Sequence, residues 1–365
     1  MKDERFPLLE FRGAPYEIGR RHGSQLKPLI QRAMTTFAES MPVPMKTVVA
    51  HAAEAIPYSS EQEPDLMEEV RGIADGSGFS LDEIFALNAS LDLQATARRF
   101  DAAAPPDCWA SAVSGAATAD GRTFVTWTAE DSAKWLPSCV LLRIESKGGL
   151  PCLVWTFAGF VGRPGMNPHL GLSAVCLAGS ESGNGLPYPF VCRRALRQKT
   201  TLDAIEAVTT VKRMSGMNYT LGDAEGRIAT IETTPRSHRV IHGNDGWVAC
   251  TGLTNDGGAP RLKTLADYAE GSVPALRLKR IDDLLHECWG RNALADIQRI
   301  QRDHGPGDLC AHDGRGWGIP CLCAFICDVK ASKLWVSHGN PCEGEYVEYD
   351  LGLEQERLGQ GRAST

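Results

Sequence analysis

Cys108 is the residue in this sequence whose position best suits a catalytic thiol. It follows a connector over residues 101–106, which ends in two prolines and cannot continue a helix, and it precedes a predicted strand over 110–117. If the bond between Asp107 and Cys108 were cut, a new α-amino group would lie beside the thiol. An α-amine has a reference pKa of about 7.7–8.0, so one residue could supply both nucleophile and base. The alternative is that Cys108 is a small buried apolar residue, as many free cysteines are.

A second group of cysteines and histidines, nearer the C-terminus, raises the question of a zinc site. The group consists of His304, Cys310, His312, Cys321, Cys323 and Cys327. Cysteines two positions apart in a strand share a face, and this spacing differs from the C-x₂-C knuckle of structural zinc. We therefore predict buried free thiols at the last three positions, and neither a metal site nor a cofactor.

Composition limits the classes of partner. The net charge of −7 and the pI of about 5.8 give no basic surface for nucleic acid. No run of apolar residues approaches the ~20 that span a bilayer, and the N-terminus lacks the apolar core of a signal peptide. Twelve irregularly spaced cysteines without an export signal predict reduced thiols in a cytoplasmic protein. We expect a small-molecule substrate, no nucleic acid and no membrane, and leave a homo-oligomer open.

The first hundred residues are mostly helical by pattern. A short strand is predicted over 8–11, and helices over 16–37 and 63–74. Ser80 and Glu83 have the spacing of a capping box that begins a third helix. The glycine-flanked His22 is expected to be a packed structural histidine, since a metal site needs several ligands.

From Cys108 onward the pattern changes to strands. Three helices interrupt them, over 201–211 (capped by Thr201), 274–288 and 293–301. The two strands that flank Gly243-Asn-Asp245 are predicted to form a hairpin. Strands are predicted over 110–117, 122–128, 140–146, 152–157, 170–177, 218–222, 227–232, 238–242, 246–251, 319–329, 334–339 and 345–351. Such an order indicates sheets that pack together and are covered by helices.

Motifs spread along the chain resemble those of the acyl-coenzyme A:6-aminopenicillanic-acid acyltransferase (penicillin acyltransferase) family of cysteine N-terminal-nucleophile hydrolases. The resemblance runs from about residue 13 to about residue 342 and depends on the order and spacing of the motifs. The motifs are Gly13-Ala-Pro-Tyr-Glu-Ile-Gly19 with His22-Gly23, Cys108 with Ala119-Asp-Gly-Arg122, Glu130-Asp131, Gly165-Met-Asn167, Asn218-Tyr-Thr-Leu-Gly-Asp-Ala-Glu-Gly226, Ile231-Glu232, Asp303-His304, Leu309-Cys310-Ala-His312 and Gly339-Asn-Pro-Cys342.

The resemblance implies an α+β protein with a four-layer αββα fold, in which helices cover two stacked, mainly antiparallel sheets. It implies an inactive precursor that cuts itself before the nucleophile. Residues 1–107 would become a small, mostly helical chain and residues 108–365 a β-rich catalytic chain, together forming one domain. Members hydrolyse amides or transfer acyl groups, so the implied substrate is an N-acyl amine or amide, with an acyl thioester as the alternative.

The same resemblance implies roles for particular residues. Cys108 would be the nucleophile, Asp131 would hold its amine, and Asn218 would donate to the oxyanion of the tetrahedral intermediate. Arg277 falls where the family has a site arginine, although a solvated charge on a helix face is an open alternative. Trp109 stands where the family has threonine or serine, and we expect this bulkier side chain to narrow the substrate pocket.

Other departures bear on the chemistry. The family has glycine where this chain has Asp107, and asparagine where it has Ala129. The residues Thr251-Gly-Leu-Thr-Asn255 match its Thr-Asn-His motif only in part. Loops over 159–168 and 179–189 are expected to add pocket residues.

We predict an amide hydrolase or acyltransferase with an acyl-cysteine intermediate, and favour hydrolysis because water is always present. Two alternatives stay open. One is a cysteine amidase that works uncut, with His304 or His312 as its base. The other is a catalytically inactive binding protein of the same fold, made conceivable by the altered residues around Cys108.

Overall fold

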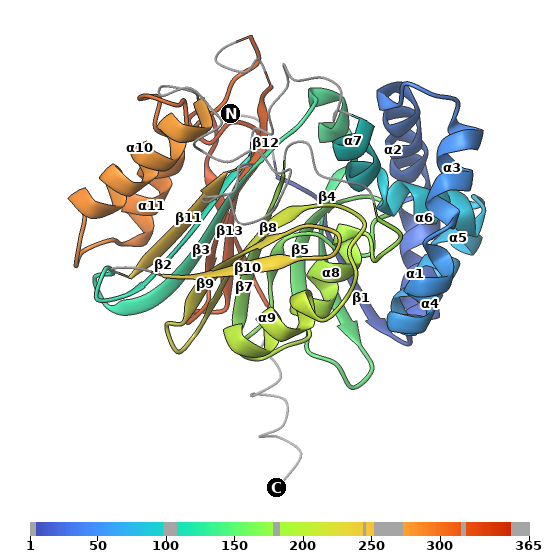
Figure 1. Ribbon diagram of the computed structural model, residues 1–365, viewed down its shortest axis with the longest axis horizontal. Coiled ribbons are helices and arrows are strands. Elements are labelled where there is room, and N and C mark those ends of the chain that lie inside the picture. Colours follow the sequence, from blue (N-terminus) through green and yellow to red (C-terminus); the bar gives the residue numbers. More distant parts are fainter. Residues whose placement is uncertain are drawn as a thin grey trace, which may run out of the picture.

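Two stacked β-sheets with helices on both outer faces make up the protein (Figure 1). The computed structural model describes residues 5–97, 108–177, 183–243, 246–251, 273–314 and 319–351. A large apolar core fills the space between the sheets and beneath the N-terminal helices. A smaller one lies under the helices that cover the second sheet. The predicted αββα layering is therefore confirmed.

The larger sheet has the strand order β1-β4-β5-β6-β7-β8-β9-β10. Its β1–β4 pair is parallel, and the other pairs of described strands are antiparallel. The strands are β1 (Leu8–Gly13), β4 (Cys139–Ser146), β5 (Cys152–Phe157), β6 (Gly165–Met166), β7 (Leu170–Cys176), β8 (Met217–Asp223), β9 (Ile228–Thr233) and β10 (His238–His242).

The smaller sheet has the order β11-β2-β3-β12-β13-β14, and its described pairs are antiparallel. It consists of β2 (Trp109–Gly115), β3 (Gly121–Glu130), β11 (Trp247–Thr251), β12 (Cys321–Asp328), β13 (Lys333–His338) and β14 (Tyr346–Asp350). Strands β2 and β3 are buried along nearly their whole length because one face packs on the larger sheet and the other under helices.

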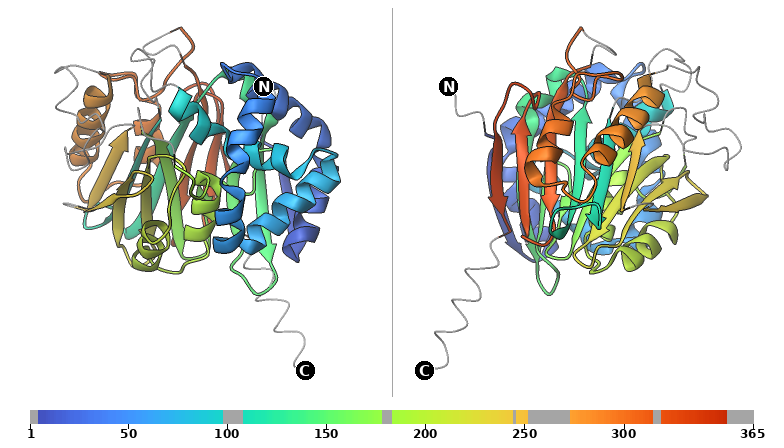
Figure 2. Two further views of the ribbon diagram at one scale, coloured as in Figure 1. Left: turned by 45° about the vertical axis from the view of Figure 1, so that its right-hand side comes forward. Right: turned by 90° about the vertical axis from the view of Figure 1, so that its left-hand side faces the viewer.

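The helices fall into two groups that cover opposite outer faces (Figure 2). The N-terminal group and the pair α8–α9 cover the larger sheet, and α10 and α11 cover the smaller one. The N-terminal group is α1 (Pro15–Gln25), α2 (Lys27–Ser40), α3 (Met45–Ala53), α4 (Ile56–Gln62), α5 (Pro64–Ser77), α6 (Leu81–Asn88) and α7 (Ser90–Ala97). The others are α8 (Tyr188–Ala195), α9 (Thr201–Thr209), α10 (Val273–Glu287), α11 (Leu294–Gln301) and the 3-10 turn η2 (Ala133–Ser138).

Three predictions of local structure are wrong. The helix expected over 16–37 is two helices, because the chain breaks at Leu26 and Pro28 lies in the first turn of α2. The N-cap of α9 is Thr200 rather than Thr201. The expected hairpin of 238–242 with 246–251 does not form, since β10 pairs with β9 in one sheet and β11 with β2 in the other.

The glycines around His22 allow α1 and α5 to lie in direct backbone contact. A Cβ atom added to Gly19 would lie 2.0 Å from the Glu69 carbonyl oxygen, and one added to Gly72 would lie 2.2 Å from that of Tyr16. The His22 ring, which is fully buried, accepts the Gly159 N–H through Nε2 at 2.9 Å. Burial, with a smaller effect of the Arg193 charge, lowers the pKa of His22 to about 3. This is the structural histidine expected from the sequence.

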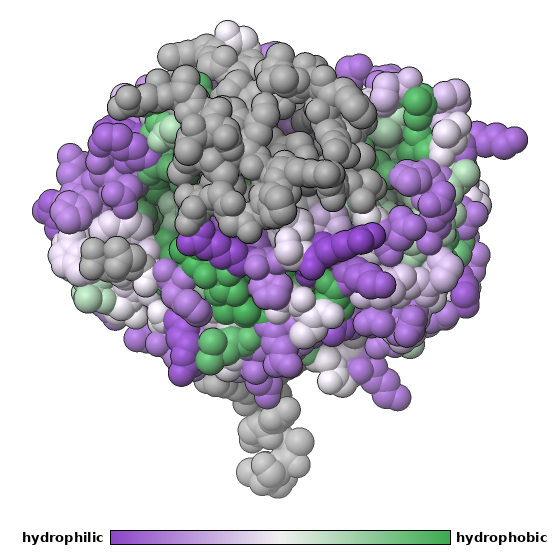
Figure 3. Space-filling model, viewed as in Figure 1, coloured by the Kyte–Doolittle hydropathy of each residue, from purple (hydrophilic) through white to green (hydrophobic). Residues whose placement is uncertain are grey.

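Hydrophilic side chains cover most of the described surface on the face in Figure 3, with apolar patches between them. Within the described ranges, no helix has the length and apolar character needed to cross a bilayer.

Candidate active site

Cys108 lies immediately before β2, where its thiol contacts the end of the neighbouring strand β3. The Cys108 Sγ atom is 3.4 Å from the backbone nitrogen of Glu130 and 3.6 Å from its carbonyl oxygen. The next residue is fixed as well, because the Trp109 N–H donates to the Thr128 hydroxyl at 3.2 Å. The β2–β3 ladder therefore holds the thiol in place. Asp107 and the connector before it lie outside the described residues.

A small pocket of about 60 Å³ opens beside this thiol, between the ends of the two sheets. Its polar lining comes from Cys108, Glu130, Asp131 and Arg163. The remaining described lining residues are mostly apolar and come from both sheets, from α7 and α8, and from the segment before β12. They are Leu91, Trp127, Ala174, Cys176, Tyr188, Met217 and Ile319.

Asp131 shares this pocket with Cys108. It directly follows β3, and its backbone N–H donates to the Pro320 carbonyl at 3.4 Å. One carboxylate oxygen accepts the Ser132 N–H at 2.7 Å. The structure thus places the Asp131 carboxylate and the Cys108 thiol on the same cavity.

Asn218 reaches the strand beside that of Cys108. It lies on β8, is fully buried, and donates through Nδ2 to the Thr251 carbonyl at 2.7 Å. Thr251 pairs with Trp109 across the β11–β2 ladder. The Asn218 amide therefore contacts β11 at the residue that pairs with Trp109, the neighbour of Cys108 in the chain. Residues 252–255, where the sequence departs from the family motif, lie outside the described residues.

Trp109 lies away from the pocket. Its fully buried indole belongs to the core under α10 and α11, where Nε1 donates to the Leu309 carbonyl at 2.9 Å. Successive residues of a strand point to opposite faces, so this position and Cys108 face different layers. The bulk of Trp109 fills the helix-covered face, and it does not line the pocket beside the thiol.

Arg277 reaches the pocket only through Glu130. Its side chain is 2% exposed, and Nη1 donates to a Glu130 carboxylate oxygen at 2.7 Å. The rest of the guanidinium donates to the carbonyls of Gly307 and Asp308, at 2.8 and 2.9 Å. The alternative of a solvated charge on a helix face is therefore wrong.

Arg163 is a pocket residue that the sequence reasoning did not single out. It comes from the loop between β5 and β6 and is 5% exposed. Its guanidinium carbon lies 4.2 to 5.8 Å from the centres of four aromatic rings, those of Phe157, Trp155, Trp127 and Tyr188. Its Nε and Nη1 atoms have no hydrogen-bond partner among the described residues.

The electrostatic surroundings keep Arg163 charged. Burial acts to lower its pKa, but interactions with Tyr188, Asp131, Cys139 and Cys108 outweigh this and raise the pKa above its ordinary value. Arginine over aromatic faces is a stabilising arrangement. The only sequence signal for this residue was its membership of a loop expected to approach the pocket, since the four rings come from three separate elements, β3, β5 and α8.

The two histidines that were alternatives for an internal base do not line the Cys108 pocket. His304 and His312 lie with Cys310 and Cys342, and the described residues that line the pocket include no histidine. The three cysteines of β12 are buried and form no disulfide.

Comparison with known proteins gives one family and a set of similar folds. The family model described as acyl-coenzyme A:6-aminopenicillanic acid acyl-transferase matches residues 154–343, just over half of the chain. A variant of the conjugated bile acid hydrolase from Clostridium perfringens is 14% identical with a TM-score of 0.46, over 67% of this chain and 97% of that one. Penicillin V acylase from Agrobacterium tumefaciens is 13% identical with a TM-score of 0.43, over 63% of this chain and 83% of that one.

Proposed function

The chain belongs to the acyl-coenzyme A:6-aminopenicillanic acid acyl-transferase family, and from this premise we propose that it is an amide hydrolase whose nucleophile is an N-terminal Cys108. The observation that carries the proposal is the pocket that brings the Cys108 thiol together with Asp131 and Arg163, with no histidine among its described lining residues. A cysteine hydrolase needs a base beside the thiol. The α-amine of Cys108 itself would meet this need.

Maturation would begin with attack of the Cys108 thiol on the carbonyl carbon of Asp107. The acyl group moves from the Cys108 nitrogen to its sulfur, the nitrogen takes up a proton, and water then hydrolyses the thioester. The products are fragment 1–107, with a new carboxylate on Asp107, and fragment 108–365, with a free amine and thiol on Cys108. The β2–β3 ladder would keep that residue in place after the cut.

In turnover, the amine removes the thiol proton while the sulfur attacks the substrate carbonyl. Asn218 is suited to bind the resulting oxyanion, because its buried side-chain amide is a hydrogen-bond donor that reaches the strand beside β2. The leaving amine takes the proton and departs, and water hydrolyses the acyl-cysteine. The fixed charge of Arg163 favours the thiolate, and Asp131 would hold the protonated amine.

The substrate class we propose is a small N-acyl amine or amide. The apolar walls from both sheets suit an acyl chain, and the Arg163 and Asp131 charges suit a polar group near the carbonyl. Hydrolysis is preferred to acyl transfer, since transfer requires a dedicated pocket for a second substrate. A screen of N-acyl amino acids and aryl-acetyl amides, read by release of the amine, would identify the acyl group.

Intact-mass analysis and N-terminal sequencing test the central claim. We expect two associated fragments, and the larger should begin Cys-Trp-Ala-Ser. A wholly uncut chain with activity would establish the rival cysteine amidase instead. A thiol-reactive acyl probe should label Cys108 faster than it labels Cys176 in the same pocket or the exposed Cys342. Equal labelling rates would support the inactive binding protein instead.

A further inference from the structure

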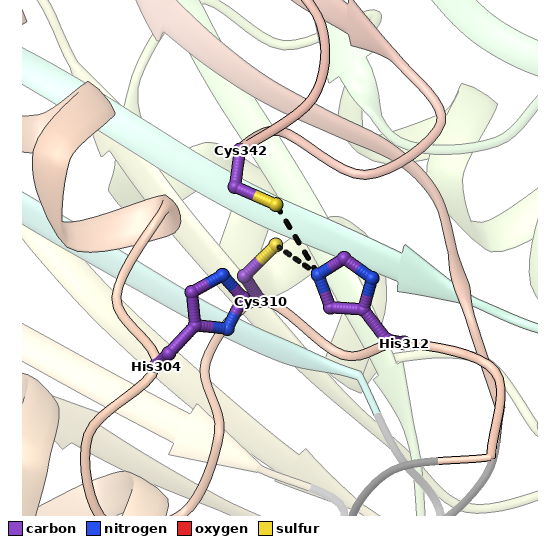
Figure 4. A group of neighbouring side chains, drawn as sticks. All are labelled: His304, Cys310, His312 and Cys342. Carbon is purple, nitrogen blue, oxygen red and sulfur yellow. Dashed lines mark hydrogen bonds between the residues drawn. The ribbon is translucent and has the colours of Figure 1, made fainter.

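Four side chains from two segments far apart in the sequence converge at one point of the surface (Figure 4). His304, Cys310 and His312 belong to the connection between α11 and β12, and Cys342 follows β13. One ligand atom from each lies within 4.8 Å of the others. We propose that these four residues, here called the Cys/His cluster, bind a structural zinc ion.

The spacing of the atoms fits a tetrahedral zinc ion. Zinc holds sulfur at about 2.3 Å and imidazole nitrogen at about 2.0–2.1 Å, which places a bound sulfur and nitrogen ~3.6 Å apart. The Nε2 atom of His312 is 3.6 Å from the Cys310 sulfur and 3.2 Å from the Cys342 sulfur. Two thiolates and two imidazoles are also a donor set that zinc prefers.

Hydrogen bonding alone explains this arrangement poorly. A neutral imidazole nitrogen has either one lone pair or one hydrogen, so two thiols directed at His312 Nε2 compete for it. A metal ion removes the competition, because each ligand atom then directs a lone pair at the ion.

The far side of each imidazole is already supported, as in protein zinc sites. The Nδ1 atom of His304 is 3.2 Å from a carboxylate oxygen of Asp308, which leaves Nε2 directed at the sulfurs. The Nδ1 atom of His312 is 2.7 Å from the Asn340 side-chain amide. The Oδ1 atom of that amide has no partner among the described residues. With the amide turned over, Oδ1 would accept the Nδ1 hydrogen and His312 Nε2 would be free for the metal.

The proposed role is structural because four protein ligands leave no open position. The loop that the ion would hold also supports the pocket wall. Its Gly307 and Asp308 carbonyls accept from Arg277, and its Leu309 carbonyl accepts from Trp109. The zinc would thus fix the segment that positions Arg277 against Glu130. The zinc ion would bind whether or not the chain catalyses the proposed reaction.

Metal analysis of the full chain, purified without chelators and without oxygen, tests the site. We expect close to one zinc per chain in the wild type, and loss of it in Cys342→Ser and His304→Ala. Cys288→Ser removes a thiol that interacts with Asp296 and Arg299 instead, and should keep the metal. Cobalt(II) added to the apo protein should give the visible absorption of a tetrahedral thiolate complex in the wild type and in Cys288→Ser only.

A finer test addresses the supporting carboxylate. Asp308→Asn should weaken zinc binding by about 10- to 100-fold in competition with a chromophoric chelator, because Asp308 orients His304. Zinc content in the wild type no higher than in folded Cys342→Ser would overturn the proposal. So would a Cys310–Cys342 disulfide in the protein purified without oxygen, since the two sulfurs would then be unavailable as ligands.

Discussion

The Cys108 pocket and the Cys/His cluster use the same reactive groups in opposite ways. In the pocket, the thiol just before β2 shares a cavity with three charged side chains, those of Glu130, Asp131 and Arg163, and the described lining has no histidine. In the cluster, two thiols and two imidazoles place their ligand atoms within 4.8 Å of one another. A thiol in a pocket without imidazole ligands can attack a carbonyl, whereas thiols that face imidazoles at ligand spacing suit a metal. The neighbours of a cysteine, rather than the cysteine itself, decide its chemistry.

The two regions are also physically connected. Arg277 donates to Glu130 at the pocket and to two carbonyls of the loop that carries the cluster. A change in the cluster can therefore reach the pocket wall through one buried guanidinium. Each region can be substituted while the function of the other is measured. Such experiments test whether catalysis belongs to the pocket and metal binding to the cluster.

The largest expected effect is that of Cys108→Ala. It should stay a single chain and lose turnover by roughly 10⁶-fold, a loss of the size found when a hydrolase loses its nucleophile. Its zinc content should equal that of the wild type. Cys342→Ser should show the reverse pattern, with cleavage before Cys108 retained and zinc lost. Intact mass, amine release and metal analysis of both variants make the comparison, and loss of zinc in folded Cys108→Ala would contradict it.

The sequence predicted the layers of the fold well, because the apolar runs of strands such as β5 are bounded by clear turn signals. The prolines before Cys108 and the strand pattern after it predicted that this residue lies at the beginning of the β-rich part of the chain. The role of Arg163 as a pocket residue could not be predicted from the sequence, since the four rings around it come from β3, β5 and α8. Likewise, Cys342 lies 30 residues beyond His312, and only the fold brings the two together.

A second prediction concerns the connection between the regions. Arg277→Met should destabilise the protein by about 3–5 kcal/mol, because it leaves the buried Glu130 carboxylate without its cation. Adding Glu130→Gln should recover much of that loss by removing the charge. Arg280→Met, one turn away, breaks a partly exposed pair with Asp303 and should cost no more than about 1 kcal/mol.

Chemical denaturation of these variants measures the three values. An equal decrease in the free energy of unfolding for Arg277→Met and Arg280→Met would show that the buried pair of Arg277 with Glu130 contributes no more to stability than the partly exposed pair of Arg280 with Asp303. Full stability in Arg277→Met with lost activity would instead favour direct contact between Arg277 and the substrate.

A third prediction tests the oxyanion donor. Asn218→Ala should lower kcat by about 10²–10³-fold, since one such donor is typically worth ~2.7–4 kcal/mol. Thr220→Ala removes the next side chain on the same face of β8, which bonds to Thr230, and should change stability but not kcat. An unchanged kcat in folded Asn218→Ala would remove this residue from the site, and its bond to Thr251 would then be structural only.

The smallest effect is expected from Asp131→Asn, and it is a shift along the pH axis. A carboxylate beside the Cys108 amine stabilises the protonated ammonium and so raises the amine pKa above its reference range of about 7.7–8.0. Removing the charge should lower that pKa by about one unit. Because the free amine is the base, the acidic limb of the kcat/KM profile should then move to lower pH. Asp120→Asn, at the exposed turn of the same hairpin, removes a carboxylate of equal charge that pairs with Arg122 and should leave the profile in place. Superimposable profiles for the wild type and Asp131→Asn would mean that this carboxylate does not support the amine. The basicity of the amine would then depend on other charges of the pocket, such as those of Arg163 and Glu130.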